Sequence, residues 1–134
     1  MLKGQCINPL IVSSLALCGH GSRILIADGN YPLAQKSGAA EKVYLGISPG
    51  LPTVTDVLKS IHSLIGIEKA VVMLPEDGST PPIFEEFRKE LGLELEGVGR
   101  YEFYDAASAP DVFLAVSTGE KRIFANILIT VGVV

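Results

Sequence analysis

Three polar side chains flank a short apolar stretch near the start of the chain, in the sequence CGHGSRILIADGNYP at residues 18–32. His20 lies between two glycines before this stretch, and Asp28 and Asn30 follow it. Imidazole, with an unperturbed pKa of about 6.5, can give or take a proton near neutral pH. Carboxylate and amide oxygens accept hydrogen bonds. The segment therefore combines a group suited to proton transfer with two groups that can bind a polar ligand.

The same residues also have a purely structural interpretation. Asp28-Gly29-Asn30 is ordinary turn chemistry. His20 could follow the end of a helix, where Gly19 and Gly21 would end the helix and its dipole would favour a protonated imidazole. From this segment alone, both interpretations stay open.

A second polar cluster lies at residues 117–129, in the sequence STGEKRIFANILI. Thr118-Gly119-Glu120 follows one apolar run, and Phe124-Ala125-Asn126 comes just before the next. Taken alone, this pattern predicts a hairpin with charged residues at its tip. Arg100 is a further candidate, although a lone arginine is more often a solvated surface charge.

Strands and helices that alternate along the chain are predicted to position these residues. Four continuous apolar or β-branched runs are typical of strands covered on both faces: residues 24–27, 70–74, 112–116 and 127–129. Apolar residues at helical spacing predict helices at residues 53–65 and from Pro81-Pro82 to Gly92, and shorter helices are expected at residues 11–18 and 101–107. Thr53 is the expected N-cap of the first of these helices.

This order of elements predicts one three-layer α/β/α domain over residues 1–134. Its sheet is expected to be mixed but mostly parallel, with an antiparallel strand at the C-terminal end. Ligands of such sheets gather outside the carboxyl ends of the strands. Asp28 and Asn30 come just after the first strand, so they are binding candidates by position as well as by type.

Composition limits the possible partners. Eleven basic residues are scattered among fifteen acidic ones, for a net charge of −4, so nucleic acid is not an expected partner. The chain has neither an apolar run long enough to cross a membrane nor the pattern of a signal peptide, which predicts a cytoplasmic protein. Apolar residues make up 48% of the chain and charged residues only 19%, which favours burial of apolar surface between subunits.

Cysteine spacing and glycine motifs argue against two kinds of cofactor. Cys6 and Cys18 have no metal-ligand spacing with His20 or His62, so we expect two reduced thiols and no metal site. Neither GxGxxG nor GxxxxGK[ST] occurs to hold phosphates, which argues against a nucleotide-binding domain.

Four pieces of the sequence, in order, resemble the RbsD/FucU family of D-ribose pyranases and L-fucose mutarotases. They are Gly19-His20 with Asp28 eight residues after the histidine, GLP at residues 50–52, Arg100 with its aromatic-rich segment, and GEKRIFANILITVGV at residues 119–133. The similarity runs almost end to end. It implies an RbsD-like fold and a cofactor-free isomerase that interconverts cyclic forms of a free monosaccharide. It also implies a homo-oligomer, with a decameric ring as the expected assembly.

The resemblance also implies roles for individual residues. His20 matches the catalytic histidine, Asp28 and Arg100 match sugar-contacting positions, and Phe124-Ala125-Asn126 matches a sugar-binding Tyr-x-Asn segment. Asn30 is added as an acceptor for sugar hydroxyls. Arg100 and DGNYP are closer to the fucose branch and GLPTVTDVL to the ribose branch, and we expect a fucose-like sugar.

Phe124 departs from the family pattern, because the usual tyrosine hydroxyl is missing there. Tyr101 or Tyr104 could supply a hydroxyl instead. The alternative function is a sugar-binding or regulatory protein of the same fold with weak or no catalysis.

The distance between His20 and Asp28 sets a geometric limit. If residues 23–27 are extended, at about 3.3 Å per residue the two side chains lie roughly 16 Å or more apart. Either the segment around His20 folds back, or neighbouring subunits complete each other's pockets.

Overall fold

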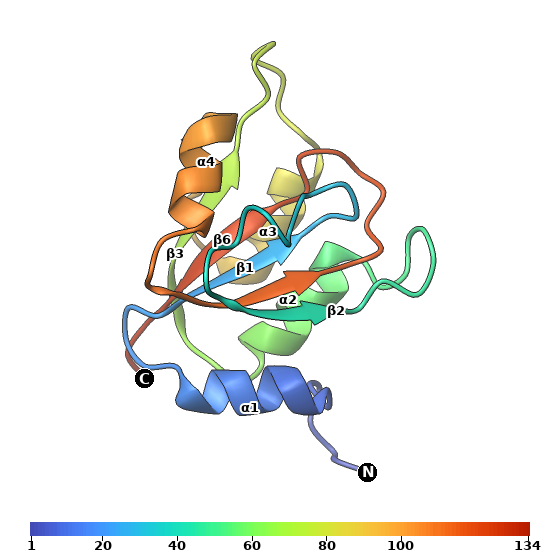
Figure 1. Ribbon diagram of the computed structural model, residues 1–134, viewed down its shortest axis with the longest axis vertical. Helices are drawn as coiled ribbons and strands as arrows, with labels where there is room; N and C mark the ends of the chain where they lie inside the picture. The colour runs from blue at the N-terminus through green and yellow to red at the C-terminus, as the bar shows by residue number, and fades with distance from the viewer.

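A six-stranded mixed sheet lies at the centre of the structure, a computed structural model that describes residues 1–134 (Figure 1). The strands are β1 (Arg23–Ala27), β2 (Glu41–Tyr44), β3 (Ile67–Met73), β4 (Glu96–Val98), β5 (Val112–Ser117) and β6 (Ile127–Val131). Their order across the sheet is β2-β5-β1-β6-β3-β4. Only β6 runs antiparallel to its neighbours, β1 and β3, which confirms the predicted mixed sheet with an antiparallel C-terminal strand.

Two strands were not predicted from the sequence. Both β2 and β4 lie at the edges of the sheet, and both are short and largely exposed. An edge strand pairs on one side only and has less need of apolar side chains, so EKVY and EGV lack the continuous apolar pattern of the central strands.

Four helices cover the sheet: α1 (Pro9–Leu17), α2 (Val54–His62), α3 (Ile83–Leu91) and α4 (Arg100–Ala107). All four were predicted. Thr53 caps α2 in a capping box with Asp56, and Gly92 ends α3 in the left-handed conformation at φ 64°. The expected extension of α2 to residue 65 is wrong, because the helix ends at His62 and Leu64 lies beyond it, exposed. No helix combines the length and apolar character needed to cross a membrane.

The helices lie on both faces of the sheet, which confirms the three-layer α/β/α architecture. Alternate residues of β1 point to opposite faces: Ile24 and Ile26 pack with α1, α2 and α3, whereas Leu25 and Ala27 pack with α4. The second face is also covered by apolar side chains from the segment between β1 and β2, among them Tyr31. Figure 1 shows α4 apart from the other three helices. The segment after β1 therefore lies on the same face as α4.

The predicted hairpin at residues 117–126 is wrong. β1 lies between β5 and β6, so the two strands do not pair with each other and the segment crosses over the end of β1. Glu120, expected at an exposed tip, is only 4% exposed. Continuous apolar strands do not reveal which neighbours they pair with, and for that reason the crossover was not visible in the sequence.

Candidate functional site

A pocket of about 300 Å³ lies at one end of the central strands of the sheet. There the carboxyl ends of β1 and β3 meet the amino end of the antiparallel β6, and the start of α4 closes one side. Its lining residues are Asp28, Asn30, Tyr31, Met73, Arg100, Tyr104, Ile123, Phe124 and Asn126. The pocket thus gathers polar side chains from both ends of the sequence, at the edge where ligands of α/β sheets bind.

Asp28 and Asn126 join the end of β1 to the start of β6. The backbone N–H of Asp28 donates to Oδ1 of Asn126 over 2.8 Å. The backbone N–H of Asn30 donates to Asp28 Oδ1 at 2.9 Å, and that of Ala125 donates to Asp28 Oδ2 at 3.2 Å. Asp28 is 3% exposed. The turn interpretation of Asp28 is therefore correct, and the turn also holds the carboxylate at the pocket floor.

Burial sets the titration of this carboxyl group. Removal from water disfavours the charged form and raises the pKa of Asp28 above its ordinary value, while hydrogen bonds from the backbone of Asn30 and Ala125 oppose that rise. The net direction is upward. Asp28 therefore takes up a proton at a higher pH than an exposed aspartate does.

The segment before β6 contributes its three residues in different ways. Phe124 is half-buried with φ 59°, in the left-handed region that residues other than glycine rarely adopt, and its side chain lines the pocket. Ala125 is fully buried and offers its backbone N–H to Asp28. Asn126 is buried and accepts from the Asp28 backbone. All three predicted residues are thus at or beneath the pocket.

Arg100 and Asn30 lie at the pocket's exposed rim. Arg100 is the first residue of α4, and no salt bridge or side-chain hydrogen bond in the structure involves its guanidinium group. Asn30 is exposed, and its side chain likewise has no partner within the chain. Both side chains are free to bind a ligand that enters from solvent.

His20 lies away from this pocket. It precedes the amino end of β1, whereas Asp28 follows the carboxyl end of the same strand. Its side chain is 61% exposed, and its Nε2 is 3.1 Å from both carboxylate oxygens of Glu68. The segment around His20 does not fold back, so one chain alone does not bring His20 and Asp28 together.

Three pocket residues were missed by sequence reasoning: Tyr31, Met73 and Ile123. Tyr31 directly follows Asn30, and Met73 lies near the carboxyl end of the strand predicted at residues 70–74, so position along the chain could have indicated both. Burial raises the pKa of Tyr31, and its hydroxyl donates to the backbone oxygen of Lys36 at 2.7 Å. Ile123 has no such signal, because its placement depends on the crossover of residues 117–126.

An ion pair between the buried Glu120 carboxylate and the more exposed Arg122 holds that crossover in place. The Glu120 carboxylate accepts hydrogen bonds from Arg122 Nε at 3.1 Å and Nη2 at 2.9 Å, and Arg122 also pairs with Glu86 of α3. Glu120 Oε2, which accepts from Arg122 Nη2, also lies 3.4 Å from the backbone nitrogen of Val54, at the start of α2. The hydrogen bonds from Arg122 lower the pKa of Glu120, and those to Glu120 raise the pKa of Arg122. This network fixes the chain just before Phe124.

Comparisons with known proteins agree with this architecture. Residues 1–134 match the model of the RbsD / FucU transport protein family. The chain is 29% identical to a D-ribose pyranase of Proteus mirabilis over 142 aligned positions, covering 99% of each chain. It is 30% identical to a fucose mutarotase of Danio rerio over 152 positions, covering 100% of this chain and 95% of the relative.

The fold likewise resembles that of a solved relative. The structure of Bacillus subtilis RbsD complexed with D-ribose superposes with a TM-score of 0.84 at 26% identity, covering 100% of this chain and 99% of the other. The similarity therefore extends from one terminus to the other in both sequence and fold. By its sequence over its full length, the chain belongs to the RbsD / FucU family.

Proposed function

We propose that this protein is a monosaccharide mutarotase or pyranase, an isomerase that interconverts cyclic forms of a free sugar without a cofactor. The observation that carries the proposal is the buried Asp28 and Asn126 pair at the floor of a pocket rimmed by Arg100 and Asn30. A small polyol needs such a mixed set of acceptors and donors. Relatives along the whole chain are a D-ribose pyranase and a fucose mutarotase, and the related RbsD structure holds D-ribose.

The reaction requires two proton transfers. Opening a cyclic hemiacetal takes a proton from the anomeric hydroxyl and gives one to the ring oxygen. We assign one of these transfers to the imidazole of His20. Asp28 would accept hydrogen bonds from sugar hydroxyls, while Arg100 would donate them.

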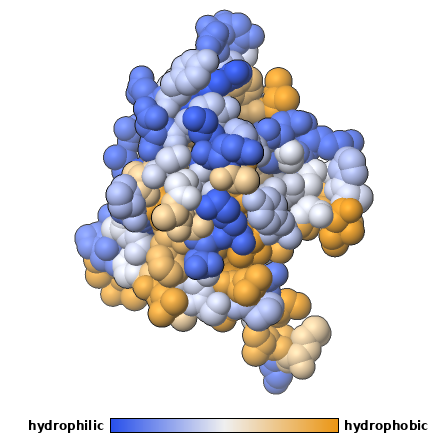
Figure 2. Space-filling view, viewed as in Figure 1, coloured by the Kyte–Doolittle hydropathy of each residue, from blue (hydrophilic) through white to orange (hydrophobic).

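Because His20 lies beyond the opposite end of β1, the proposal includes a second subunit. We propose a homo-oligomer, a decameric ring, in which His20 of one subunit reaches the Asp28 pocket of a neighbour. Large apolar side chains stand exposed on and around α1, including Ile7, Leu10 and Leu17. Figure 2 shows hydrophobic residues gathered over the lower part of the molecule, where α1 lies. Such a surface favours association between copies.

For the sugar itself, we propose a fucose-like monosaccharide rather than ribose. The sequence features behind this choice are Arg100 and DGNYP, and Arg100 and Asn30 both line the pocket. We propose the cytoplasm as the site of action, where the two free thiols of Cys6 and Cys18 would persist.

Saturation-transfer NMR of sugar anomers tests the proposal directly. We expect the protein at micromolar concentration to speed exchange between the α and β signals of L-fucose, and to a lesser extent of D-ribose. Bovine serum albumin at equal concentration serves as the control. Exchange no faster than with albumin for either sugar, or for a panel of other hexoses and pentoses, would contradict the proposed activity.

A sugar-binding protein with weak catalysis is the second candidate, and Phe124 is the observation that favours it. The residue lines the pocket but offers no hydroxyl. In this case the sugar's NMR signals would show binding to the pocket without accelerated exchange.

Sugar affinity should fall on acidification. Protonation of Asp28 removes acceptor capacity for sugar hydroxyls, and its raised pKa places the loss above the ordinary aspartate value of about 3.9. Isothermal titration calorimetry between pH 4 and 7 would measure this. Asp28→Asn should bind weakly at every pH in this range. A wild-type affinity that stays constant down to pH 4 would show that Asp28 does not bind sugar as a carboxylate.

Glu68→Gln should lower turnover modestly. Its carboxylate fixes the imidazole of His20 through Nε2, but both side chains are about half exposed or more. Exposed pairs contribute about 0.2–1 kcal/mol, so a decrease of up to about fivefold is expected, with sugar affinity unchanged. Glu96→Gln is the matched control, because it removes a similarly exposed pair with Lys69 and leaves His20 untouched. Equal turnover in both variants would contradict the orienting role of Glu68.

A further inference from the structure

We infer that Tyr104 is a second catalytic residue, whose hydroxyl exchanges a proton with the sugar ring oxygen in place of the hydroxyl that Phe124 lacks. This inference rests on the proposed mutarotase function. Ring opening needs a proton donor as well as a base, and His20 can fill only one of these roles at a time. The ionisable groups that line the pocket are therefore candidates for the donor.

Four ionisable groups line the pocket: Asp28, Tyr31, Arg100 and Tyr104. Each oxygen of the Asp28 carboxylate already accepts a backbone N–H, an arrangement that suits an acceptor. An arginine side chain does not serve as the proton donor, because a guanidinium group is not deprotonated in proteins. The hydroxyl proton of Tyr31 is engaged with the backbone oxygen of Lys36 at 2.7 Å, and burial further opposes its ionisation by raising its pKa.

Tyr104 is the group that remains. It is half-buried, it lines the pocket, and no hydrogen bond within the chain involves its hydroxyl. It lies one helical turn after Arg100, so both side chains leave the same face of α4. Tyr101 differs, because it is 74% exposed and does not line the pocket. Of the two tyrosines that the sequence offered as replacements, only Tyr104 is in position.

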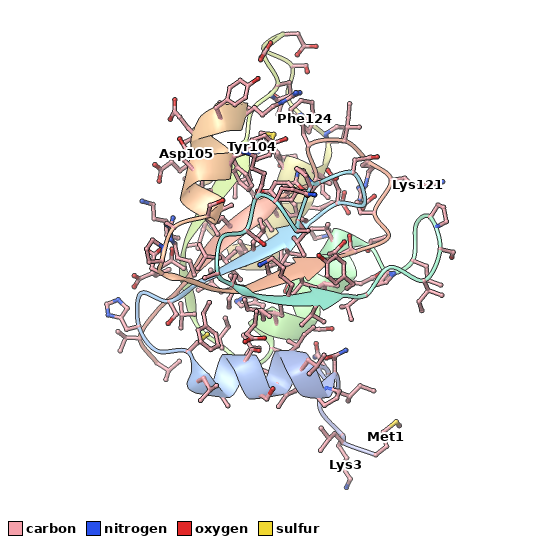
Figure 3. All side chains as sticks on the ribbon, viewed as in Figure 1. Met1, Lys3, Tyr104, Asp105, Lys121 and Phe124 are labelled. Atoms are coloured by element: carbon pink, nitrogen blue, oxygen red, sulfur yellow. The ribbon has the colours of Figure 1, made fainter.

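Neighbouring side chains hold the Tyr104 ring in place. The ring of Tyr31 packs edge-on against it, with centroids 5.5 Å apart and planes at 71°. The Lys36 ammonium lies 5.6 Å from the centroid of the Tyr104 ring and makes a cation–π contact with it. Figure 3 shows Tyr104 and Phe124 at the same end of the molecule, and both line the one pocket. The Tyr104 hydroxyl is therefore carried by a fixed ring. It lies in the same pocket as Phe124, which stands where the family usually has a tyrosine.

The proton balance of the step is simple. His20 takes the proton of the anomeric hydroxyl, the bond between the anomeric carbon and the ring oxygen breaks, and the carbonyl forms. The ring oxygen takes the proton of the Tyr104 hydroxyl, which becomes a phenolate. After the aldehyde rotates, the ring closes when the open-chain hydroxyl attacks the carbonyl carbon and gives its proton to the Tyr104 phenolate. His20 returns its proton to the carbonyl oxygen, which becomes the new anomeric hydroxyl. Nothing is consumed, as an isomerisation requires.

A double-mutant cycle of Tyr104→Phe and Phe124→Tyr tests the inference. Tyr104→Phe should lower the anomer exchange rate about a hundredfold or more, as expected for loss of a positioned acid–base group. Sugar affinity should change by no more than about tenfold, the value of one neutral hydrogen bond. Tyr101→Phe, the matched control, should exchange sugar at the wild-type rate.

The Phe124→Tyr variant gives the sharper result. Phe124→Tyr alone should raise exchange by no more than about tenfold, the value of one added neutral hydrogen bond, because Tyr104 already serves as the proton donor. In the Tyr104→Phe background the same change should restore exchange at least about tenfold, since it returns a hydroxyl to the same pocket. Restoration would separate a chemical role of the hydroxyl from a packing role of the ring.

Two results would overturn the inference while the proposed function stands. One is exchange by Tyr104→Phe within threefold of wild type. The other is a loss in Tyr104→Phe that Phe124→Tyr does not restore and that is matched by an equal loss of sugar affinity. If the wild type itself exchanges no sugar, the proposed function fails first, and the inference falls with it.

Discussion

Replacing His20 with alanine is expected to remove sugar exchange while leaving the fold intact. Loss of a positioned acid–base group lowers turnover by about a hundredfold to ten-thousandfold. The side chain is 61% exposed and its hydrogen-bond partner is Glu68, so little packing is lost. Saturation-transfer NMR would measure the exchange, and thermal unfolding would show an unchanged midpoint. An unchanged exchange rate would remove His20 from the mechanism.

The separation of His20 from Asp28 allows a second test with the same variant. Asp28→Asn should also be inactive, because it alters the pocket floor. If each pocket takes Asp28 from one subunit and His20 from another, unfolding and refolding the two variants together should restore activity. For random 1:1 mixing, about a quarter of the pockets would carry both intact residues.

The single variants refolded alone are the controls for this mixing experiment. Activity in the mixture well above that of either variant supports pockets shared between subunits. A mixture as inactive as its components, although mass spectrometry shows mixed oligomers, would contradict the shared pocket. A wild-type protein that light scattering finds monomeric at micromolar concentration would contradict the proposed ring.

Glu120→Gln is expected to lower the free energy of unfolding by about 2 kcal/mol, because a hydrogen bond to a charged group contributes about 1.5–3 kcal/mol and glutamine keeps only one of the two oxygens that accept from the Arg122 guanidinium. Urea unfolding at pH 7 would measure the difference. Glu85→Gln is the matched control, since its pair with Arg88 is largely exposed and should contribute well below about 1 kcal/mol. Equal losses in both variants would contradict a special role of the buried Glu120 carboxylate.

The pH dependence of this difference has a definite sign. The pKa of Glu120 is lowered in the folded state, so its contribution is present above the unfolded value of about 4.3 and is lost as pH falls through the folded pKa. Wild type and Glu120→Gln should therefore converge in stability as the pH is lowered below about 4. A gap that stays constant down to pH 3 would show that the ionised carboxylate is not its source.

Much of this architecture was determined by the sequence itself. Four central strands and four helices were predicted because their signals are local: continuous apolar runs, apolar residues at helical spacing, the N-cap Thr53 and the stop at Gly92. The end of α2 and the edge strands β2 and β4 were not predicted. Packing against the sheet decides where α2 ends, and pairing on one side only decides the edge strands. Asp28, Arg100 and Phe124 were named as candidates from residue type, position and family resemblance.

Only the tertiary structure decided which of these residues meet. The burial of Glu120 and the crossover of residues 117–126 depend on β1 lying between β5 and β6. The place of Tyr104 in the pocket depends on α4 packing on the same face of the sheet as the segment after β1. His20 and Asp28 lie eight residues apart in the chain, yet an extended strand holds them beyond opposite ends of β1. Asn126 is 98 residues from Asp28 and hydrogen-bonds to it. Strand pairing and direction set these distances, and neither is encoded in the local pattern of apolar and polar residues.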